Sequence, residues 1–252
     1  DRRQRQMCKE TVSDVNMAYS EHARRYLADC GLPKERTYVT GSPMAEVLHN
    51  NLADIEASDV HQRLGLEKGK YILLSAHREE NIDTEKNFLS LFTAINKMAE
   101  KYDMPILYSC HPRSRNRLAA SGFQLDPRVI QHEPLGFHDY NCLQMNAFAV
   151  VSDSGTLPEE SSFFTSIDHP FPAICIRTST ERPEAIDKGD FIIAGIDEKS
   201  LLQAVDTAVE LCRDGQHGIP VPDYVDENVS TKVVKIVQSY VGIVNKMVWR
   251  KF

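Results

Sequence analysis

Residues 148–160, FAVVSDSGTLPEE, decide the fold of this chain. An apolar run, Phe148 to Val151, leads directly into a turn of small residues that opens a helix. Small residues at a strand-to-helix turn let backbone N–H groups and a hydroxyl approach an anion, and the helix N-terminus adds partial positive charge. The stretch therefore predicts a strand, a turn and a helix with a phosphate site at the turn.

Two glutamates follow this turn, in the first turn of the predicted helix. One of them, Glu159, favours the helix dipole from outside. The other, Glu160, lies six residues past Ser154 and is placed to turn inward and accept two hydrogen bonds from a ribose diol. The alternative is an ordinary helix cap with acidic residues in its first turn. On this stretch alone both interpretations stay open.

The chain alternates β-rich runs with amphipathic helical stretches, which is typical of a parallel sheet covered by helices. Helices are predicted at 88–102, 116–121, 140–146, from 157, at 183–188 and at 200–213. Strands are predicted at 71–75, 106–109, 129–131, 149–152, 173–177 and 191–194. Together these elements predict an α/β fold, a Rossmann-like doubly wound parallel sheet of about five strands.

The two flanks are too short for a core of their own. Before residue 65 the sequence predicts a helix at 20–29, an extended piece at 37–40 and a helical region at 44–64, and the chain ends in a helix at 230–249. We expect parts at 1–64, 65–215 and 216–252. Asp1 stands where a natural start has methionine, so we also expect that an N-terminal portion precedes it.

Composition narrows the setting. Asp and Glu number 36 against 29 Lys and Arg, a net charge of -7, which argues against a nucleic-acid backbone as a general partner. Six cysteines without C-x-x-C pairing resemble reduced cytosolic thiols and indicate neither a disulfide framework nor a zinc site. No apolar run approaches about 18 residues, and the first residues are polar. We expect a soluble, cytoplasmic protein with no membrane span.

Polar residues after the predicted strands belong together, because ligands of an open parallel sheet bind at the carboxyl ends of its strands. Besides the turn after 149–152, such segments are AHREEN at 76–81, CHPRSR at 110–115, EPLGFHDY at 133–140 and RTSTERPE at 177–184. Each alone could be a solvated loop. Together they bring histidine, arginine and a helix start to one edge, and buried cations without an anionic ligand would be costly. The pattern predicts a diphosphate pocket.

These motifs, in this order, resemble those of the non-hydrolysing UDP-N-acetylglucosamine 2-epimerases. The matching motifs are TGSP at 40–43, AHREEN at 76–81, SCHP at 109–112, DSG at 153–155 with the two glutamates, and TERPEA at 180–185. The resemblance implies two Rossmann-like domains of GT-B type, with the nucleotide sugar in the cleft, and this chain as the C-terminal half. It also implies that 1–64 is a remnant of the first domain with connecting helices. In the same way, 65–215 would bind UDP, and the helix in 216–252 would pack back on the first domain.

The resemblance also implies the residues of the site. His77 contacts the phosphate or sugar and is the catalytic candidate, whereas Arg182 reaches toward the nucleotide sugar. Ser154 and Gly155 form the diphosphate cradle, and Glu160 holds the ribose hydroxyls. The full set of implied UDP-binding residues is His77, Arg78, His111, Leu135, Tyr140, Ser154, Gly155, Thr156, Glu160 and Arg182.

Four of these positions carry a qualification. Thr156 stands where the family commonly has a second glycine, so its N–H is available but its side chain adds bulk. Leu135 replaces an expected polar residue beside uracil and could serve through its backbone only. Tyr140 matches the same loop, but a tyrosine at a helix start is often an amphipathic wall residue. His111 either caps a strand end or supports the pocket.

The implied reaction is inversion at C2 of a UDP-linked 2-acetamido sugar, by anti elimination of UDP and re-addition with protonation from the other face. Positive helix ends and Arg or His donors stabilise charge on the diphosphate, and paired carboxylates act as base and acid. No cofactor or metal is required. The family supplies those carboxylates from its first domain, and the opening residues DRRQRQ do not reproduce the pattern. We therefore expect these 252 residues alone to bind UDP weakly and not to epimerise a UDP-sugar.

Two further segments, YNCLQMN at 140–146 and NKMVWR at 245–250, resemble the subgroup that makes UDP-N-acetyl-L-fucosamine from UDP-2-acetamido-2,6-dideoxy-L-talose for capsule and O-antigen polysaccharide. The family also implies a homodimer. Three alternatives stay open: a UDP-GlcNAc/UDP-ManNAc 2-epimerase, the donor domain of a GT-B glycosyltransferase, and a non-catalytic nucleotide-sugar binding module.

Overall fold

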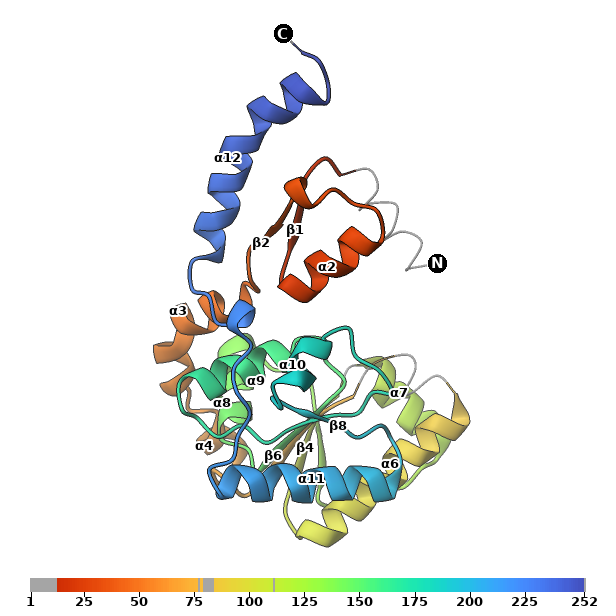
Figure 1. The fold of residues 1–252 in the computed structure, drawn as a ribbon. Coiled ribbons are helices and arrows are strands. Elements are labelled where there is room, and N and C mark those ends of the chain that lie inside the picture. Colours follow the sequence, from red (N-terminus) through yellow and green to blue (C-terminus); the bar gives the residue numbers. More distant parts are fainter. Residues whose placement is uncertain (1–12, 77, 79–83, 111, 252) are drawn as a thin grey trace. The chain divides into compact units, whose positions relative to one another are not determined.

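The computed structural model describes residues 13–76, 78, 84–110 and 112–251, in which the helices and strands form two compact units (Figure 1). Unit 1 joins two distant stretches of the chain, Asp1–His49 and Val221–Phe252. Unit 2 is the continuous stretch Asn50–Pro220, and it contains the predicted Rossmann-like elements.

A parallel sheet forms the centre of unit 2. In the described part of this unit the sheet has six strands, in the order β5-β4-β3-β6-β7-β8. This is the doubly wound order in which three strands run to one edge and three to the other. The order in which strands are added reverses between β3 and β6, which is the topological switch point of the sheet. The strands are β3 (Ile72–Ser75), β4 (Ile106–Ser109), β5 (Val129–His132), β6 (Ala149–Ser152), β7 (Ala173–Cys175) and β8 (Ile192–Ile193).

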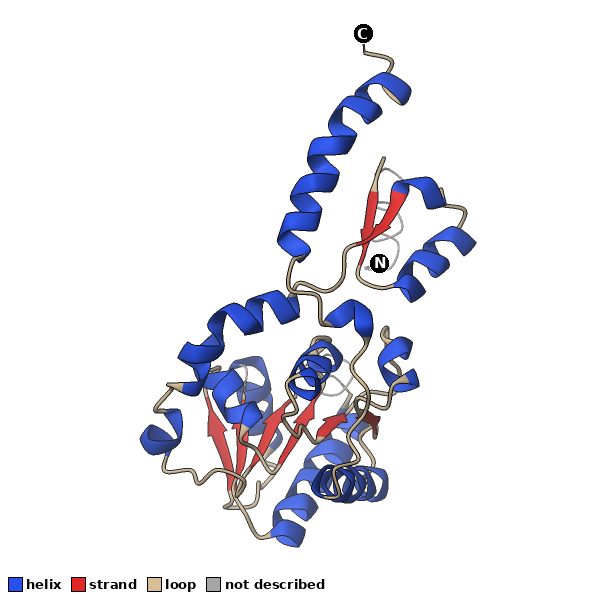
Figure 2. Ribbon diagram, turned by 60° about the vertical axis from the view of Figure 1, so that its left-hand side comes forward, coloured by secondary structure: helices blue, strands red, loops and turns tan. Residues whose placement is uncertain are grey.

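Helices cover both faces of this sheet (Figure 2). Every residue of β3, β4 and β6 is buried, as continuous apolar runs in a parallel sheet require. On one face, Ile72 and Leu74 belong to a buried cluster with Phe92, Ile95 and Leu201. The helices of unit 2 are α4 (Val60–Leu64), α6 (Glu85–Tyr102), α7 (Pro112–Ser121), α8 (Phe137–Met145), α9 (Leu157–Ser166), α10 (Pro183–Asp187) and α11 (Glu198–Arg213).

The predicted Rossmann-like sheet is confirmed, and the differences lie at element ends. The predicted helical region at 44–64 consists of two helices, because α3 (Met44–Glu56) ends and α4 begins separately at Val60. Ser58 explains the break: its hydroxyl accepts from the Val60 amide and donates to Asp139. The predicted strands at 173–177 and 191–194 are longer than the observed β7 and β8.

Unit 1 is built around a short parallel pair, β1 (Asn16–Ala18) and β2 (Thr37–Val39). Helix α2 (Glu21–Asp29) follows β1 and is capped by Ser20, whose hydroxyl accepts from the Ala23 amide. The long helix α12 (Val229–Met247) belongs to the same unit. The hydroxyls of Tyr240 on α12 and Tyr38 on β2 form a hydrogen bond, so residues about 200 positions apart in the sequence are in contact.

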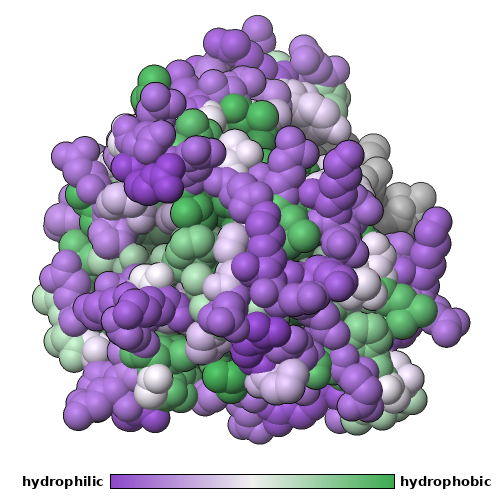
Figure 3. Space-filling view, turned by 90° about the horizontal axis from the view of Figure 1, so that it is seen from below, coloured by the Kyte–Doolittle hydropathy of each residue, from purple (hydrophilic) through white to green (hydrophobic). Residues whose placement is uncertain are grey.

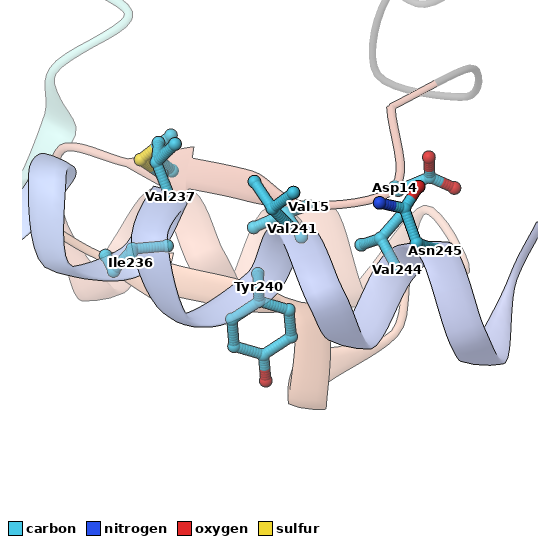
Figure 4. Close-up of a pocket in the computed structure, with 9 residues that line it drawn as sticks. Asp14, Val15, Ile236, Val237, Tyr240, Val241, Val244 and Asn245 are labelled. Carbon is cyan, nitrogen blue, oxygen red and sulfur yellow. The ribbon is translucent and has the colours of Figure 1, made fainter. Parts of the chain in front are cut away.

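An apolar groove of about 320 Å³ lies between α12 and the segment that contains β1 (Figure 4). Val237 and Val241 line it and are 48% and 56% exposed. By contrast, the surface seen from the side of α11 and α6 is mostly hydrophilic, with hydrophobic residues scattered among hydrophilic ones (Figure 3). Unit 1 therefore presents apolar surface along α12. The groove is lined by Asp14, Val15, Met17, Ile236, Val237, Tyr240, Val241, Val244 and Asn245.

Candidate functional site

The turn between β6 and α9 lies at the switch point of the sheet. Ser75 at the end of β3 and Ser152 at the end of β6 are paired in register. The Asp153 amide donates to the Ser75 carbonyl at 3.0 Å, and the Ser154 amide donates to the Ser152 hydroxyl at 3.0 Å. These bonds fix the direction in which the chain leaves the sheet, and they place the predicted phosphate turn where doubly wound sheets bind ligands.

Ser154, Thr156 and Glu160 are joined by hydrogen bonds. The Thr156 hydroxyl donates to Glu160 Oε1 at 2.8 Å and lies 2.9 Å from the Ser154 hydroxyl. The Thr156 amide donates to Ser154 Oγ at 3.3 Å. The structure therefore brings the predicted diphosphate cradle and the predicted ribose carboxylate together.

Glu160 is a buried carboxylate in a weakly polar surrounding. It is 8% exposed, and burial raises its pKa to about 7, against the effect of the Thr156 hydrogen bond. Two side chains of α8 act on it: hydrogen bonding by Gln144 lowers the Glu160 pKa, and the Tyr140 pKa is raised first by burial and then by the Glu160 charge. A carboxylate with a strongly perturbed pKa at a ligand-binding edge is a candidate functional group.

Glu159 does not face the solvent, contrary to the prediction that it favours the helix dipole from outside. It is 3% exposed, and Oε1 lies 3.1 Å from both Nε and Nη2 of Arg182. Burial raises the Glu159 pKa, and the Arg182 charge opposes this rise. The prediction for Glu159 is therefore wrong, because it considered only the helix dipole. The Arg182 guanidinium, immediately before α10, pairs with the carboxylate, and this pairing allows Glu159 to be buried. The pair holds Arg182 close to the start of α9.

A second arginine lies against the glycine of the turn. The Arg78 amide donates to Asp153 Oδ2 at 2.8 Å, and its Nε donates to the Asp153 carbonyl at 3.0 Å. A Cβ atom built on Gly155 would lie 3.3 Å from Arg78 Nη2. The guanidinium therefore lies beside the predicted cradle, and a small residue at position 155 leaves room for it.

Not every cation of the strand-end segments is available to a ligand. Arg177 is 4% exposed and forms two bonds to Glu181, of 2.8 and 2.7 Å. The Arg177 guanidinium lowers the Glu181 pKa to about 2. Because Arg177 is almost fully buried and a carboxylate already neutralises it, Arg177 is a structural cation and not a strong candidate for the diphosphate. Arg182 is also paired, but its side chain is 28% exposed.

The remaining predicted residues differ in how they relate to the turn. Leu135 is half-buried in the segment before α8, and Gly136 begins that helix. His77 and His111 lie outside the described residues. Gln144 was not predicted, although it is 1% exposed and faces Glu160. A buried glutamine in a helix was the available signal, since such a residue must find polar partners.

The arrangement can bind an anion and a diol side by side. Backbone amides at a helix start and the Arg78 and Arg182 guanidinium groups attract phosphate oxygens, and Glu160 accepts hydroxyl protons. Within residues 13–76, 78, 84–110 and 112–251, no group of three or more His, Cys, Asp or Glu side chains is arranged to hold a metal ion. The same residues contain no helix that is both long and apolar enough to cross a membrane.

A doubly wound sheet with a glycine turn at its switch point defines the class of Rossmann-like nucleotide-binding domains. Comparison with known proteins narrows this class. Residues 3–238 match the family described as UDP-N-acetylglucosamine 2-epimerase, so this chain belongs to the UDP-N-acetylglucosamine 2-epimerase family.

Individual relatives agree with this assignment. The UDP-N-acetylglucosamine 2-epimerase of Methanococcus maripaludis is 29% identical over 203 residues, which are 77% of this chain and 54% of that protein. The structure of UDP-N-acetylglucosamine 2-epimerase from Rickettsia bellii matches with a TM-score of 0.84 and 38% identity, over 96% of this chain and 64% of that one. The chain spans about half the length of the curated relatives it matches.

A third relative was crystallised with ligands. The Methanocaldococcus jannaschii UDP-GlcNAc 2-epimerase, in complex with UDP-GlcNAc and UDP, matches with a TM-score of 0.80 and 25% identity, over 91% of this chain and 62% of that one. The predicted family and its GT-B-like fold are therefore confirmed.

Proposed function

We propose that this chain is the UDP-binding part of a non-hydrolysing UDP-sugar 2-epimerase. The observation that carries the proposal is the buried Glu160 carboxylate, joined by hydrogen bonds to the Ser154–Gly155 turn at the switch point. In this assignment Glu160 accepts the ribose hydroxyls, and the turn binds the diphosphate at Gly155, since the Ser154 and Thr156 amides donate to hydroxyls within the turn. Arg78 and Arg182 neutralise the diphosphate from the side.

The cations are also the groups through which this part would assist the reaction. Elimination of UDP from C1 develops negative charge on the departing diphosphate, and fixed donors in a water-poor site stabilise that charge. Arg78 and Arg182 are held in place by Asp153 and Glu159, so little reorganisation is required as the charge develops. His77 is proposed as a further contact to the phosphate or sugar.

Removal of the C2 proton needs a base that the described turn does not offer. Asp153 is fully buried and accepts from the Arg78 amide, and Glu159 is paired with Arg182. Glu160 is assigned to the ribose. We therefore propose that the acid and base come from outside this turn, and that the 252 residues alone bind UDP without epimerising a UDP-sugar.

The proposal has a more specific form for the sugar. The segments 140–146 and 245–250 favour UDP-N-acetyl-L-fucosamine as the product, for capsule or O-antigen polysaccharide. UDP-GlcNAc/UDP-ManNAc epimerisation is the second candidate, favoured by the names of the relatives. A homodimer and a cytoplasmic location complete the proposal, and light scattering after size exclusion tests the homodimer.

Calorimetric titration of the 252-residue chain with UDP tests the assignment. We expect UDP to bind more tightly than uridine, because the diphosphate contacts supply much of the affinity. Incubation with UDP-GlcNAc, or with UDP-2-acetamido-2,6-dideoxy-L-talose, in deuterated water is expected to leave C2 unlabelled. Failure to bind UDP would refute the binding site, and deuterium at C2 would refute the proposed need for outside groups. Release of UDP only when a sugar acceptor is added would favour a glycosyltransferase instead.

A further inference from the structure

Thr156 does not use its hydroxyl as a residue at the start of a helix usually does. A threonine before the first turn normally caps the helix by accepting a hydrogen bond from an amide two or three residues later. Here Thr156 makes no such side-chain bond, and the amides of Glu159 and Glu160 donate to its backbone carbonyl instead, each at 3.0 Å. The Thr156 hydroxyl is therefore available for the Glu160 carboxylate, 2.8 Å away.

The order of donation in this network follows from the chemistry of the groups. An ionised carboxylate only accepts hydrogen bonds, so the single hydroxyl proton of Thr156 must go to Glu160. The Ser154 hydroxyl, 2.9 Å from Thr156 Oγ1, is then the donor to Thr156. Donation runs from Ser154 to Thr156 to Glu160. While it does so, the Ser154 proton is directed away from any bound phosphate.

Protonation of Glu160 permits the opposite order. A neutral carboxyl can donate to Thr156, Thr156 can then donate to Ser154, and the Ser154 proton becomes free to turn toward a phosphate oxygen. Tyr140 and Gln144 face Glu160 from α8, and Glu159 lies beside it on α9 as the partner of Arg182. Burial, which raises the Glu160 pKa to about 7, would bring this change into the neutral range.

From this geometry we propose that Thr156 is a positioning residue whose hydroxyl couples the ribose carboxylate, Glu160, to the diphosphate cradle at Ser154. The inference rests on the proposed UDP site and adds to it. A glycine at this position would provide an amide but no hydroxyl, so the coupling requires Ser or Thr here. The side chain of Thr156 is thus part of the site and not merely added bulk.

The first test needs no ligand. Carbon-13 NMR of the labelled glutamate carboxyl carbons follows the titration of Glu160, which a Glu160→Gln variant identifies. Thr156→Val keeps the shape of the side chain and removes the hydroxyl, and we expect the Glu160 titration midpoint to rise by about one pH unit. Thr156→Ser is expected to titrate within a few tenths of the wild type. Thr165→Val makes the same change at the other end of α9 and serves as the matched control.

The second test measures the affinity for UDP by calorimetric titration between pH 6 and pH 8.5. Because the wild type directs the Ser154 proton away from phosphate only while Glu160 is ionised, we expect its UDP affinity to fall as the pH rises through about 7. This fall is expected to be lost in Thr156→Val and retained in Thr156→Ser. The losses caused by Ser154→Ala and Glu160→Gln are expected to be non-additive in the wild type and additive in the Thr156→Val background.

Three results would overturn the coupling, and a fourth would refute the proposed function instead. An unchanged Glu160 midpoint in Thr156→Val would overturn the coupling, and so would the same pH profile of UDP binding in Thr156→Ser and Thr156→Val. Additive losses in the wild type would overturn it as well. If the wild type binds no UDP, the proposed function fails, and the NMR titration still decides whether Thr156 controls Glu160.

Discussion

Replacement of Glu160 by glutamine should stabilise the protein at high pH while it damages the UDP site. Glu160 is 8% exposed, and its pKa rises from an ordinary 4.5 to about 7 on burial. Each factor of ten in the ionisation constant is worth about 1.4 kcal/mol, so the ionised carboxylate costs the fold about 3 kcal/mol above pH 7. Glutamine has nearly the same shape and carries no charge, so it should avoid most of this cost.

The sign of the pH dependence follows from the raised pKa. Below about pH 4.5 the carboxyl is protonated in the folded and the unfolded protein, and its contribution to stability is fully present. That contribution is lost as the pH rises through about 7, where the folded state must give up its proton. Glu160→Gln is therefore expected to match the wild type near pH 4 and to exceed its free energy of unfolding by about 2–3 kcal/mol at pH 8.

Urea unfolding at four pH values, followed by far-UV circular dichroism, measures this difference. The one tryptophan, Trp249, belongs to unit 1, so its fluorescence would not report on the sheet of unit 2. Amide exchange of the β6 peptide assigns the transition to unit 2. Glu85→Gln, an exposed change in the first turn of α6, is the matched control.

Function should move in the opposite direction. At pH 8 we expect Glu160→Gln to lower UDP affinity more than tenfold, since a charged acceptor for the ribose is lost. A variant that is no more stable than the wild type at pH 8 would refute the reasoning. A gain in stability of the same size at pH 4 and pH 8 would also refute it, because such a gain could not come from ionisation.

Two other variants test the cations beside the turn. Arg182→Met leaves the buried Glu159 without its cation, so the free energy of unfolding should fall by about 2–4 kcal/mol and UDP should bind more weakly. Unchanged urea unfolding would contradict a stabilising Arg182–Glu159 ion pair. Gly155→Ala places a methyl group 3.3 Å from Arg78 Nη2, so calorimetry should show several-fold weaker UDP binding with little loss of stability. Gly242→Ala, where a Cβ has open space, is its control, and equal UDP affinity in both variants would contradict the close approach.

The sheet could be predicted because its strands are continuous apolar runs. The predicted strand at 149–152 and the helix start at 157 agree with β6 and α9. In both cases the signal is local: buried residues on both faces of a strand, then small residues at a turn. Strand β1 could not be predicted in this way, because Asn16–Ala18 is three residues long and mixes polar with apolar side chains.

The orientation of Glu159 and Glu160 could not be predicted because the two residues are adjacent in the first turn of α9. Helix periodicity places them about 100° apart, and the contacts of each carboxylate depend on what packs against its side of the helix. Arg182, 23 residues later in the chain, pairs with Glu159, and α8 covers Glu160. Both choices are made by tertiary contacts, which a pattern within one helix does not contain.

Helix α8 explains why the polar side of the pocket was incompletely predicted. Residues 141–145 of α8 are all buried, so in this part of the helix an exposed polar face does not distinguish functional from structural residues. Its polar side chains bond to one another: Asn141 Nδ2 donates to the Phe137 carbonyl at 2.8 Å, and Gln144 Nε2 donates to Asn141 Oδ1 at 2.6 Å. Among the described residues, Gln144 Oε1 has no hydrogen-bond donor. A buried acceptor needs a donor, and a hydroxyl of a bound ligand would meet that need.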